Sequence, residues 1–551
     1  MNLDVLVRSE NKPLIESILL DMPAPSLNDN TADLDRLSRT MDHLGFSPVR
    51  IQPRKMDELV RKMRACMVAP FGEPVPGERR TGSRSGSYAE EDGGNFCFRV
   101  VAGCTGTNWE ILDIAAWSSD ASVFGFAVDL GSTSLAFRLI DITRRKIVRE
   151  MLVVNPQVAR GEDILSRIIF ARDREGLAAL RDSLVHACSD AMGKMLVDSG
   201  ISARFVYAVS CAGNTAMSHF FWGLDPSNIC REPYIPAANT FPVVSAAELG
   251  FDFLPNALLY LFPNVGSYVG GDIVAGVVAA GLNSSTEFRM LIDVGTNAEI
   301  VLGNREWLLA CAGAAGPALE GGVVERGMQA AAGAIDKVRI DRRTLEPDFH
   351  VIGGGKAAGI CGSGLIELVA EMFSSKILNI QGKFNTELNC PRIRNTPEGP
   401  AYALALAYQT DDEQEMLITE IDVGIFLKSK AAMFTILSLI CRKVGMSFDD
   451  LKSIYIAGNF GNHVDPEMAV RIGMIPDLPL EIYHAIGNSS LLGASMLTCD
   501  RTVLEEAERV RSMITYVELN VNVELMNEFR GALFIPHTDR KLFPSVVLDD
   551  E

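Results

Sequence analysis

Apolar residues recur at every second position, or in short runs, between Phe126 and Asp141 and again between Met290 and Gly303. In each stretch an apolar run ends in Asp, a turn with Gly follows, and a second apolar run begins. A short polar turn between two such runs is typical of a β-hairpin. The pattern therefore predicts two hairpins of one design, with Asp129 and Asp293 in equivalent positions.

The N-terminal part of the chain has helical spacing instead. Leu34, Leu37, Met41 and Leu44 fall on one face of a helix that Asn30-Thr31 can cap and that Gly45 can stop. Residues 55–67 read as a second helix. We therefore expect a small N-terminal α/β domain over residues 1–120.

Beyond the first hairpin, the pattern predicts a third strand at 146–153 and a helix of small residues at 268–282, which we interpret as a hinge between two lobes. An amphipathic helix is expected at 431–444, followed by a strand at 454–456. The expected fold is α/β, with a first lobe at 121–285, a second lobe at 286–500 and a C-terminal extension at 501–551 that packs on the core.

Composition narrows the class of protein. The chain has 551 residues, of which 48% are apolar, enough for several large buried cores. A formal charge of −19 repels nucleic acid and anionic lipid over most of the surface, so neither is expected as a partner. No apolar run reaches the roughly 18 residues of a membrane span, and the N-terminus lacks the pattern of a signal peptide. We expect a cytoplasmic protein.

Eleven cysteines are scattered along the chain without any C-x-x-C pair. Zinc ribbons and ferredoxin-type clusters need close pairs, so no iron–sulfur cluster is predicted. Most of the cysteines are expected to be reduced and buried. His219 and His463 are expected to be hydrogen-bonded structural residues.

The two turns have the chemistry of phosphate binding. Glycine lets the backbone approach a bound group, turn N–H groups can face phosphate oxygens, and each Asp can hold a hydrated divalent cation. A single turn of this kind is more often only structural, but the duplication favours a nucleotide cleft. The residues predicted to surround the phosphates are Gly131, Ser132, Thr133, Gly295, Thr296 and Asn297.

A further turn follows the strand at 454–456. A strand ending in Gly-Asn-x-Gly leaves backbone open at its C-terminal edge, where α/β sheets bind ligands. We assign Gly458, Asn459, Phe460 and Gly461 to the adenosine side of the cleft. A simple strand-to-helix turn is the alternative.

Several segments, taken in order, resemble one family, the ATP-dependent reductive activators of corrinoid proteins, which belong to the superfamily of actin, sugar kinases and heat-shock chaperones. The resemblance runs from about Phe124 to Val546 and covers the N-terminal part weakly. The segments that carry it are VDLGSTS, NPQVARGEDILSRI, AGNTAMSHFFWGLDPSNICREPYIP, YVGGDIVAG, LIDVGTNAEI, GICGSGL, AGNFGNHV and FIPHTDRKLFPSV.

The resemblance implies a two-lobed, duplicated ribonuclease-H-like ATPase core of the actin type that closes on Mg-ATP. Asp129 and Asp293 would lie near the Mg²⁺, and Glu299 would orient or activate the attacking water, or else only pair with a cation. It also implies an ATP hydrolase that binds a corrinoid protein of a methyltransferase system and promotes reduction of inactive Co(II) to Co(I). Members of the family generally carry an iron–sulfur ferredoxin-like domain, and this sequence shows neither the cysteine spacing nor an obvious domain for it.

Because no cluster is predicted, we expect a separate, ferredoxin-like electron donor; the alternative is that the chain has lost the redox role. Three rival functions stay open: a small-molecule kinase of the same superfamily, a non-redox nucleotide-dependent binding switch, and an activator of radical dehydratases, which is disfavoured because those proteins bridge a cluster between subunits. A homodimer is kept as an alternative to a monomer.

Overall fold

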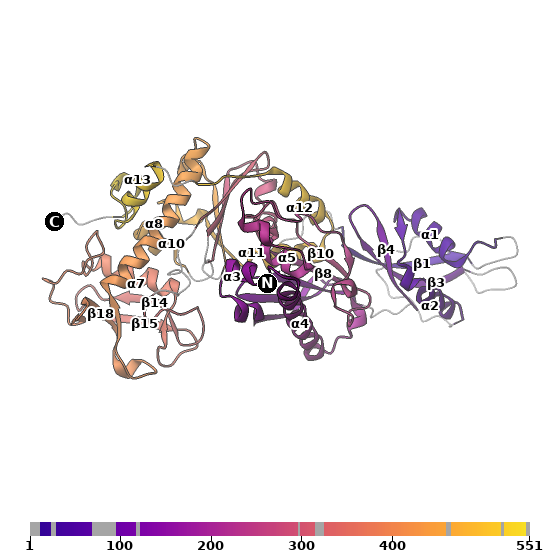
Figure 1. Ribbon diagram of the computed structural model, residues 1–551, viewed down its shortest axis with the longest axis horizontal. Helices are drawn as coiled ribbons and strands as arrows, with labels where there is room; N and C mark the ends of the chain where they lie inside the picture. Colours follow the sequence, from indigo (N-terminus) through magenta and orange to yellow (C-terminus); the bar gives the residue numbers. More distant parts are fainter. Residues whose placement is uncertain are drawn as a thin grey trace. The chain divides into compact units, whose positions relative to one another are not determined.

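The computed structural model describes residues 12–23, 29–68, 95–116, 122–295, 298–313, 324–458, 464–519 and 523–546 (Figure 1). The chain divides into two compact units, of which the first joins residues 1–279 to 490–512 and the second joins 280–489 to 513–551. Each unit contains a six-stranded mixed sheet. The domain limits drawn from the sequence differ from these units and stay a prediction.

The N-terminal part of the first unit has a sheet of its own, in the order β1-β3-β4-β2. Its strands are β1 Ile15–Pro23, β2 Val49–Arg50, β3 Asn95–Cys104 and β4 Trp109–Ala115. Two helices, α1 Asp33–His43 and α2 Met56–Val68, lie beside this sheet in Figure 1. The α/β character of this part and both of its predicted helices are therefore confirmed, while its standing as a separate domain stays a prediction.

The prediction that Asn30-Thr31 caps α1 is wrong. Ala32 occupies the N-cap position and no side chain caps the helix. The hydroxyl of Thr31 donates instead to the carboxylate of Asp29. The predicted stop is confirmed, because Gly45 has a φ of 89° and its N–H donates to the carbonyl of Asp42.

Buried polar contacts join this N-terminal sheet to the rest of the first unit. The ammonium of Lys55 donates to Asn256 Oδ1 at 2.8 Å. The hydroxyl of Tyr207 donates to the carboxylate of Asp113 at 3.0 Å. The Lys55 ammonium also donates to the carbonyl of Leu112 at 2.7 Å. Burial lowers the pKa of Lys55 to about 8, so its two acceptors offset only part of the desolvation cost.

The large sheet of the first unit has the order β7-β6-β5-β8-β10-β9. Its strands are β5 Phe124–Leu130, β6 Ser134–Asp141, β7 Lys146–Val154, β8 Val206–Gly213, β9 Val244–Ser245 and β10 Leu258–Leu261. The helices of this unit are α3 Ile164–Phe170, α4 Arg174–Ser199, α5 Thr215–Trp222, α6 Gly271–Ala280, α11 Ser489–Cys499 and α12 Thr502–Met513. The predicted first hairpin, third strand and small-residue helix are all present, while the hinge role of that helix stays a prediction.

The large sheet of the second unit has the order β21-β20-β11-β12-β13-β22. Its strands are β11 Arg289–Val294, β12 Ala298–Gly303, β13 Leu308–Gly313, β20 Ser453–Ala457, β21 Tyr483–Gly487 and β22 Ile514–Tyr516. Two three-stranded sheets accompany it: β14 Ala334–Ile340, β15 Pro347–Val351 and β16 Gly359–Ile360, and β17 Ile393–Thr396, β18 Gly399–Ala405 and β19 Met416–Thr419. Its helices include α7 Gly362–Ser374, α8 Glu420–Lys443, α10 Pro466–Arg471 and α13 Val523–Ala532.

The two large sheets repeat one pairing scheme. In the first, β5 is antiparallel to β6 and parallel to β8, and β8 is parallel to β10. In the second, β11 is antiparallel to β12 and parallel to β20, and β20 is parallel to β21. The hairpin is extended by an antiparallel third strand in both cases. The duplicated core that the sequence predicts is therefore confirmed.

Helix α8 is longer than the sequence pattern indicates. It begins at Glu420 because Thr419 and Asp422 form a capping box, each side chain accepting from the other residue's backbone N–H. Among the described helices it is the one with the length and hydropathy of a membrane span, with a mean hydropathy of 1.6, but 78% of that window is buried inside the protein. The core helix of a folded domain has these same properties.

The chain after α13 is anchored to α8 by one buried cation. The ammonium of Lys430 donates to the carbonyls of Ala532, Phe534 and Pro536, the second at 2.7 Å. Burial lowers the pKa of Lys430 well below its ordinary value. Three carbonyl acceptors satisfy all three donors of the ammonium, which fixes the C-terminal segment on this unit.

Candidate functional site

The first hairpin brings Asp129 to the end of strand β5. Its carboxylate is half-buried and its Oδ1 accepts a hydrogen bond from the hydroxyl of Ser490 at 2.8 Å. The predicted phosphate turn of Gly131, Ser132 and Thr133 follows directly. A Cβ at Gly131 would lie 2.3 Å from the carbonyl oxygen of Ser134, so only glycine fits the turn.

The second hairpin holds Asp293 in the equivalent place. Asp293 is paired with Glu299 across the antiparallel ladder, which sets their side chains on the same face of the sheet. The residue paired with Asp129 in the first hairpin is Ala136. Only the second hairpin therefore offers a carboxylate next to its Asp, at the position where the sequence predicts the water-orienting residue.

The turn of the second hairpin is described in part. Gly295 follows β11 and is half-buried, while Thr296 and Asn297 lie outside the described residues. The two turns differ in length: Leu130 pairs with Leu135 in the first hairpin, whereas Val294 pairs with Ala298 in the second. The hairpins thus share their Asp and Gly positions but not the number of residues in the turn.

A second internal repeat borders both Asp residues, and the sequence reasoning missed it. Asp129 is paired with Ala212 of β8, and Asp293 is paired with Ala457 of β20. Each of these alanines is followed by Gly-Asn in the chain. The signal that could have found the repeat is the Ala-Gly-Asn triplet itself, which follows an apolar strand in both lobes.

Gly458 packs closely against Asp293. It has a φ of 83°, and a Cβ there would lie 2.7 Å from the carbonyl oxygen of Val294 and 3.3 Å from Asp293 Oδ1. The residue must therefore be glycine for two independent reasons. Asn459, Phe460 and Gly461, the other residues assigned to adenosine, lie outside the described residues.

Two consecutive serines contact the two Asp residues, and the sequence reasoning missed them as well. Ser489 donates from its hydroxyl to Asp293 Oδ2 at 3.2 Å, and Ser490 donates to Asp129 Oδ1 at 2.8 Å. Both serines are buried and stand in the first turn of α11. A Ser-Ser pair between the end of a strand and an apolar helix is typical of a helix start, which is the available sequence signal.

His219 has the structural role that its sequence context predicts. It is fully buried, its Nδ1 lies 2.7 Å from the carbonyl of Thr215, and its Nε2 accepts from the N–H of Ala237 at 3.1 Å. A carbonyl partner requires the proton on Nδ1, so the neutral ring satisfies both contacts. Burial lowers the pKa of His219. His463 lies outside the described residues.

Eight of the eleven cysteines are buried. Burial raises the pKa of Cys188, Cys311 and Cys441 to about 12, so these thiols stay protonated. Within the described residues, no three His, Cys, Asp or Glu side chains gather as a metal site.

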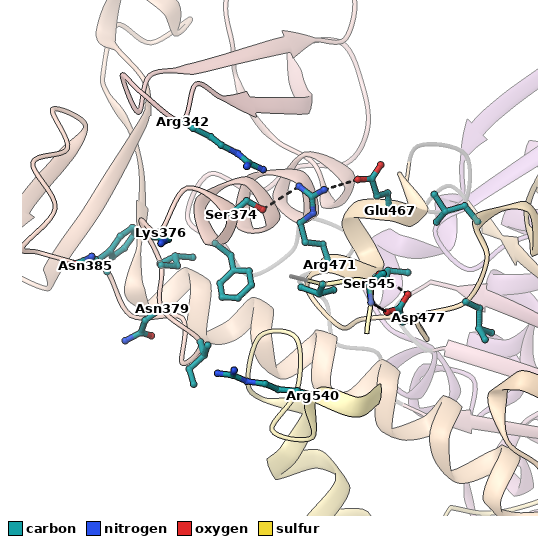
Figure 2. A pocket seen from close by; sticks show the side chains of 18 of the residues that line it. Arg342, Ser374, Lys376, Asn379, Asn385, Glu467, Arg471, Asp477, Arg540 and Ser545 are labelled. Carbon is teal, nitrogen blue, oxygen red and sulfur yellow. Dashed lines mark hydrogen bonds and ion pairs between the residues drawn. The ribbon is translucent and has the colours of Figure 1, made fainter. Parts of the chain in front are cut away.

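A cavity of about 1620 Å³ lies in the second unit (Figure 2), and its lining includes none of the predicted site residues that the structure describes. It is lined by the end of α7, by α10 and by the C-terminal segment. In Figure 2, Arg471 reaches Glu467 at 2.6 Å and Ser374 at 3.3 Å. Its volume exceeds the several hundred Å³ of an ordinary small-molecule pocket, and the nucleotide prediction does not depend on it.

Comparison with known families gives two matches that follow one another along the chain. The RACo middle region matches residues 124–285. The C-terminal domain of RACo, the ASKHA domain, matches residues 287–547. Together they span the two lobes and the segment after them.

Three known proteins are similar over most of the chain. The corrinoid activation enzyme RamQ of Eubacterium limosum is 27% identical over 76% of this chain and 72% of its own length. The [Co(II) methylated amine-specific corrinoid protein] reductase of Methanosarcina barkeri is 24% identical over 71% of this chain and 73% of its own. A solved structure of a reductive activator for corrinoid, iron–sulfur protein is 34% identical, with a TM-score of 0.84, over 98% of this chain and 82% of its own. The chain therefore belongs to the family of reductive activators of corrinoid proteins, with the actin-like ASKHA fold.

Proposed function

We propose that this protein is an ATP-dependent activator that binds a corrinoid protein and promotes reduction of its inactive Co(II) to Co(I). The observation that carries the proposal is the likeness to the reductive activator, at 34% identity and a TM-score of 0.84 over 98% of the chain. The names of the two curated relatives, a corrinoid activation enzyme and a Co(II) corrinoid protein reductase, support the same chemistry.

The nucleotide is proposed to be ATP with Mg²⁺. The turns at 131–133 and 295–297 would surround the phosphates, and Gly458–Gly461 would border the adenosine. Asp129 and Asp293 would hold the cation. Carboxylate and hydroxyl oxygens are hard ligands that suit Mg²⁺. That cation usually keeps several waters and binds through one or two carboxylates and substrate phosphates, which fits the scarcity of clustered ligands among the described residues.

Glu299 is proposed to orient the water that attacks the terminal phosphate. Its position across the ladder from Asp293 supports this role, because a carboxylate there would lie beside the cation-binding residue. The first hairpin has Ala136 in the matching place, so the roles of the two hairpins would differ. Asp129 would serve in binding, and the Asp293–Glu299 pair would serve in hydrolysis.

ATP use would have to overcome an unfavourable electron transfer. Each 59 mV of unfavourable one-electron potential costs about 1.4 kcal/mol. Such coupling requires that ATP favour one conformation and that this conformation bind the corrinoid protein differently from the other. The electron is proposed to come from a separate ferredoxin-like protein, because the cysteine spacing of this chain does not suit an iron–sulfur cluster.

The test mixes the purified protein with a candidate Co(II) corrinoid protein, a low-potential reductant and ATP, and follows Co(I) by absorbance. We expect Co(I) to form faster with ATP than without it. D293N should abolish both ATP hydrolysis and the acceleration while the fold is kept. E306Q, an exposed carboxylate between β12 and β13, is the matched control and should behave as wild type. Equal Co(I) formation with and without ATP for every corrinoid partner would refute the proposal.

A further inference from the structure

In the first hairpin, all three carbonyls of the predicted phosphate turn accept hydrogen bonds from residues of one segment, which follows β7. The carbonyl of Gly131 accepts from Asn155 Nδ2 at 2.9 Å, and that of Thr133 accepts from the backbone N–H of Asn155 at 2.9 Å. The carbonyl of Ser132 accepts from Arg167 Nη1 at 2.7 Å. Two residues therefore fix three consecutive peptide units.

Asn155 is itself fixed in place. It is fully buried and begins the 3-10 helix Pro156–Arg160, where its Oδ1 accepts from the N–H of Gln157 at 2.9 Å. Both ends of its side-chain amide are therefore used, the oxygen as a cap and the nitrogen as a donor to the turn. This double use holds the amide in one orientation.

Arg167 is fixed in the same manner. It is fully buried in α3, and its Nε donates to the carbonyl of Gly161 at 2.8 Å. Its remaining nitrogen, Nη2, is buried without a hydrogen-bond partner among the described residues. The acidic residue acting on it, Asp163, is exposed and caps α3 by accepting from Ser166 at 2.8 Å. The positive charge of Arg167 thus lies under the turn without an ion pair in the described chain.

A fixed carbonyl also fixes the N–H that follows it, because the peptide unit is planar and trans. Holding the carbonyls of residues 131 to 133 therefore sets the direction of the next three N–H groups before any ligand arrives. Preorganised donors bind an anion without the cost of ordering the loop. A buried cation without an ion-pair partner is costly, and a bound anion would reduce that cost.

We propose that Asn155 and Arg167 are positioning residues that preorganise the turn 131–133 for the phosphates of a nucleoside triphosphate. This inference rests on the proposed function, because it assumes that the protein binds ATP. Arg167 acts through the turn and through its charge, whereas Asn155 acts through the turn alone. Loss of either residue weakens the hold on the phosphates and leaves recognition of the adenosine intact.

The test measures the affinity of the full-length protein for ATP and for adenosine by calorimetry, the latter by competition where it is weak. R167Q is expected to lower ATP affinity about ten- to a hundredfold, the usual range for losing a hydrogen bond from a charged group. R167K keeps the positive charge and a single donor nitrogen, so its ATP affinity should lie between those of R167Q and the wild type. R172Q, an exposed arginine just after α3, is the matched control and should bind ATP as wild type.

N155D supplies an independent second variant. Its carboxylate can still accept from Gln157, so the cap is kept, but the donor to Gly131 is lost and a negative charge is placed beneath the turn. We expect a loss of ATP affinity at least as large as in R167Q. Circular dichroism and urea unfolding show whether each variant is folded, and any variant that fails to fold leaves the decision to the other two.

The outcomes separate the two proposals. If the wild type binds no ATP, the proposed function fails and this inference fails with it. If the wild type binds ATP and the folded variants bind it equally well, only this inference is overturned. An equal loss of ATP and adenosine affinity would also overturn it, because that pattern indicates general damage to the fold rather than loss of phosphate positioning.

Discussion

Single residues set the chemistry that each hairpin can perform. Asp129 and Asp293 occupy equivalent places, yet one is paired with Ala136 and the other with Glu299. Gly458 is required by its φ of 83° and by its contact with Val294. These local constraints make the second hairpin the proposed hydrolytic one, although the two hairpins have the same strand pairing.

His219 gives a prediction about pH. Burial lowers its pKa in the folded state below the ordinary value of about 6.5, so the unfolded chain binds more protons between these two values. The free energy of unfolding should therefore fall as the pH drops below about 6.5, by at most about 1.4 kcal/mol per pH unit from this residue. The contribution should be fully present above that pH.

Urea unfolding of wild type and H219Q at several pH values checks the prediction. The stability difference between the two proteins should narrow as the pH falls from 7 to 5. H186Q, which removes a histidine whose side chain is 80% exposed on α4, is the control and should show no such trend. A wild type to H219Q difference that stays constant with pH would contradict the prediction.

At the scale of the elements, small residues allow two helices to pack closely against each other. A Cβ at Gly493 of α11 would lie 2.4 Å from the carbonyl of Ala275 in α6, so the two helices touch at backbone distance. The abundance of small residues at 268–282, noted in the sequence, has its physical reason in this contact. α11 is also the helix whose first turn supplies Ser489 and Ser490.

Substitution of Gly493 by Ala tests the helix contact. We expect a loss of about 1–3 kcal/mol in the free energy of unfolding, because the added methyl overpacks the interface. G193A, in the interior of α4 with open space around the added carbon, should instead stabilise by about 0.5–1 kcal/mol. Chemical unfolding of both variants measures these changes in the free energy of unfolding. A stabilising G493A would contradict the prediction and show that the helices separate easily.

At the scale of the whole molecule, the chain repeats the design of one lobe. Its cysteines, in contrast, are scattered along the sequence. The two large sheets share their pairing scheme, whereas the cysteines are dispersed over both units. The repeated core is consistent with the proposed nucleotide site. The dispersed cysteines are the reason for proposing a separate electron donor.

Reconstitution tests the predicted lack of an iron–sulfur cluster. The protein is incubated anaerobically with iron and sulfide, desalted, and analysed for iron, acid-labile sulfide and visible absorbance. We expect no retained iron and no cluster absorbance, because protonated, dispersed thiols are poor ligands. A stoichiometric cluster would overturn the prediction.

The sequence by itself determined the local elements, and it supplied the candidate site residues that stay a prediction. Alternating apolar positions and the Asp-x-Gly turns specify both hairpins, because strand geometry has a period of two residues and a tight turn depends on the few residues within it. Asp129 and Asp293 could be named as candidates on that basis, Gly458 from the turn that follows a strand, and Glu299 only from the family resemblance. The cap at Asn30-Thr31 failed because Thr31 found a closer partner in Asp29.

The tertiary structure alone decided which distant residues meet. Pairing of β5 with β8 and of β11 with β20 aligned Ala212 and Ala457, the first residues of the two triplets, with the two Asp residues. Packing of α11 brought Ser490 to Asp129, and folding of the segment after β7 placed Asn155 and Arg167 under the first turn. Such contacts depend on how whole elements pack around a core, and no pattern within a short stretch of sequence records that packing.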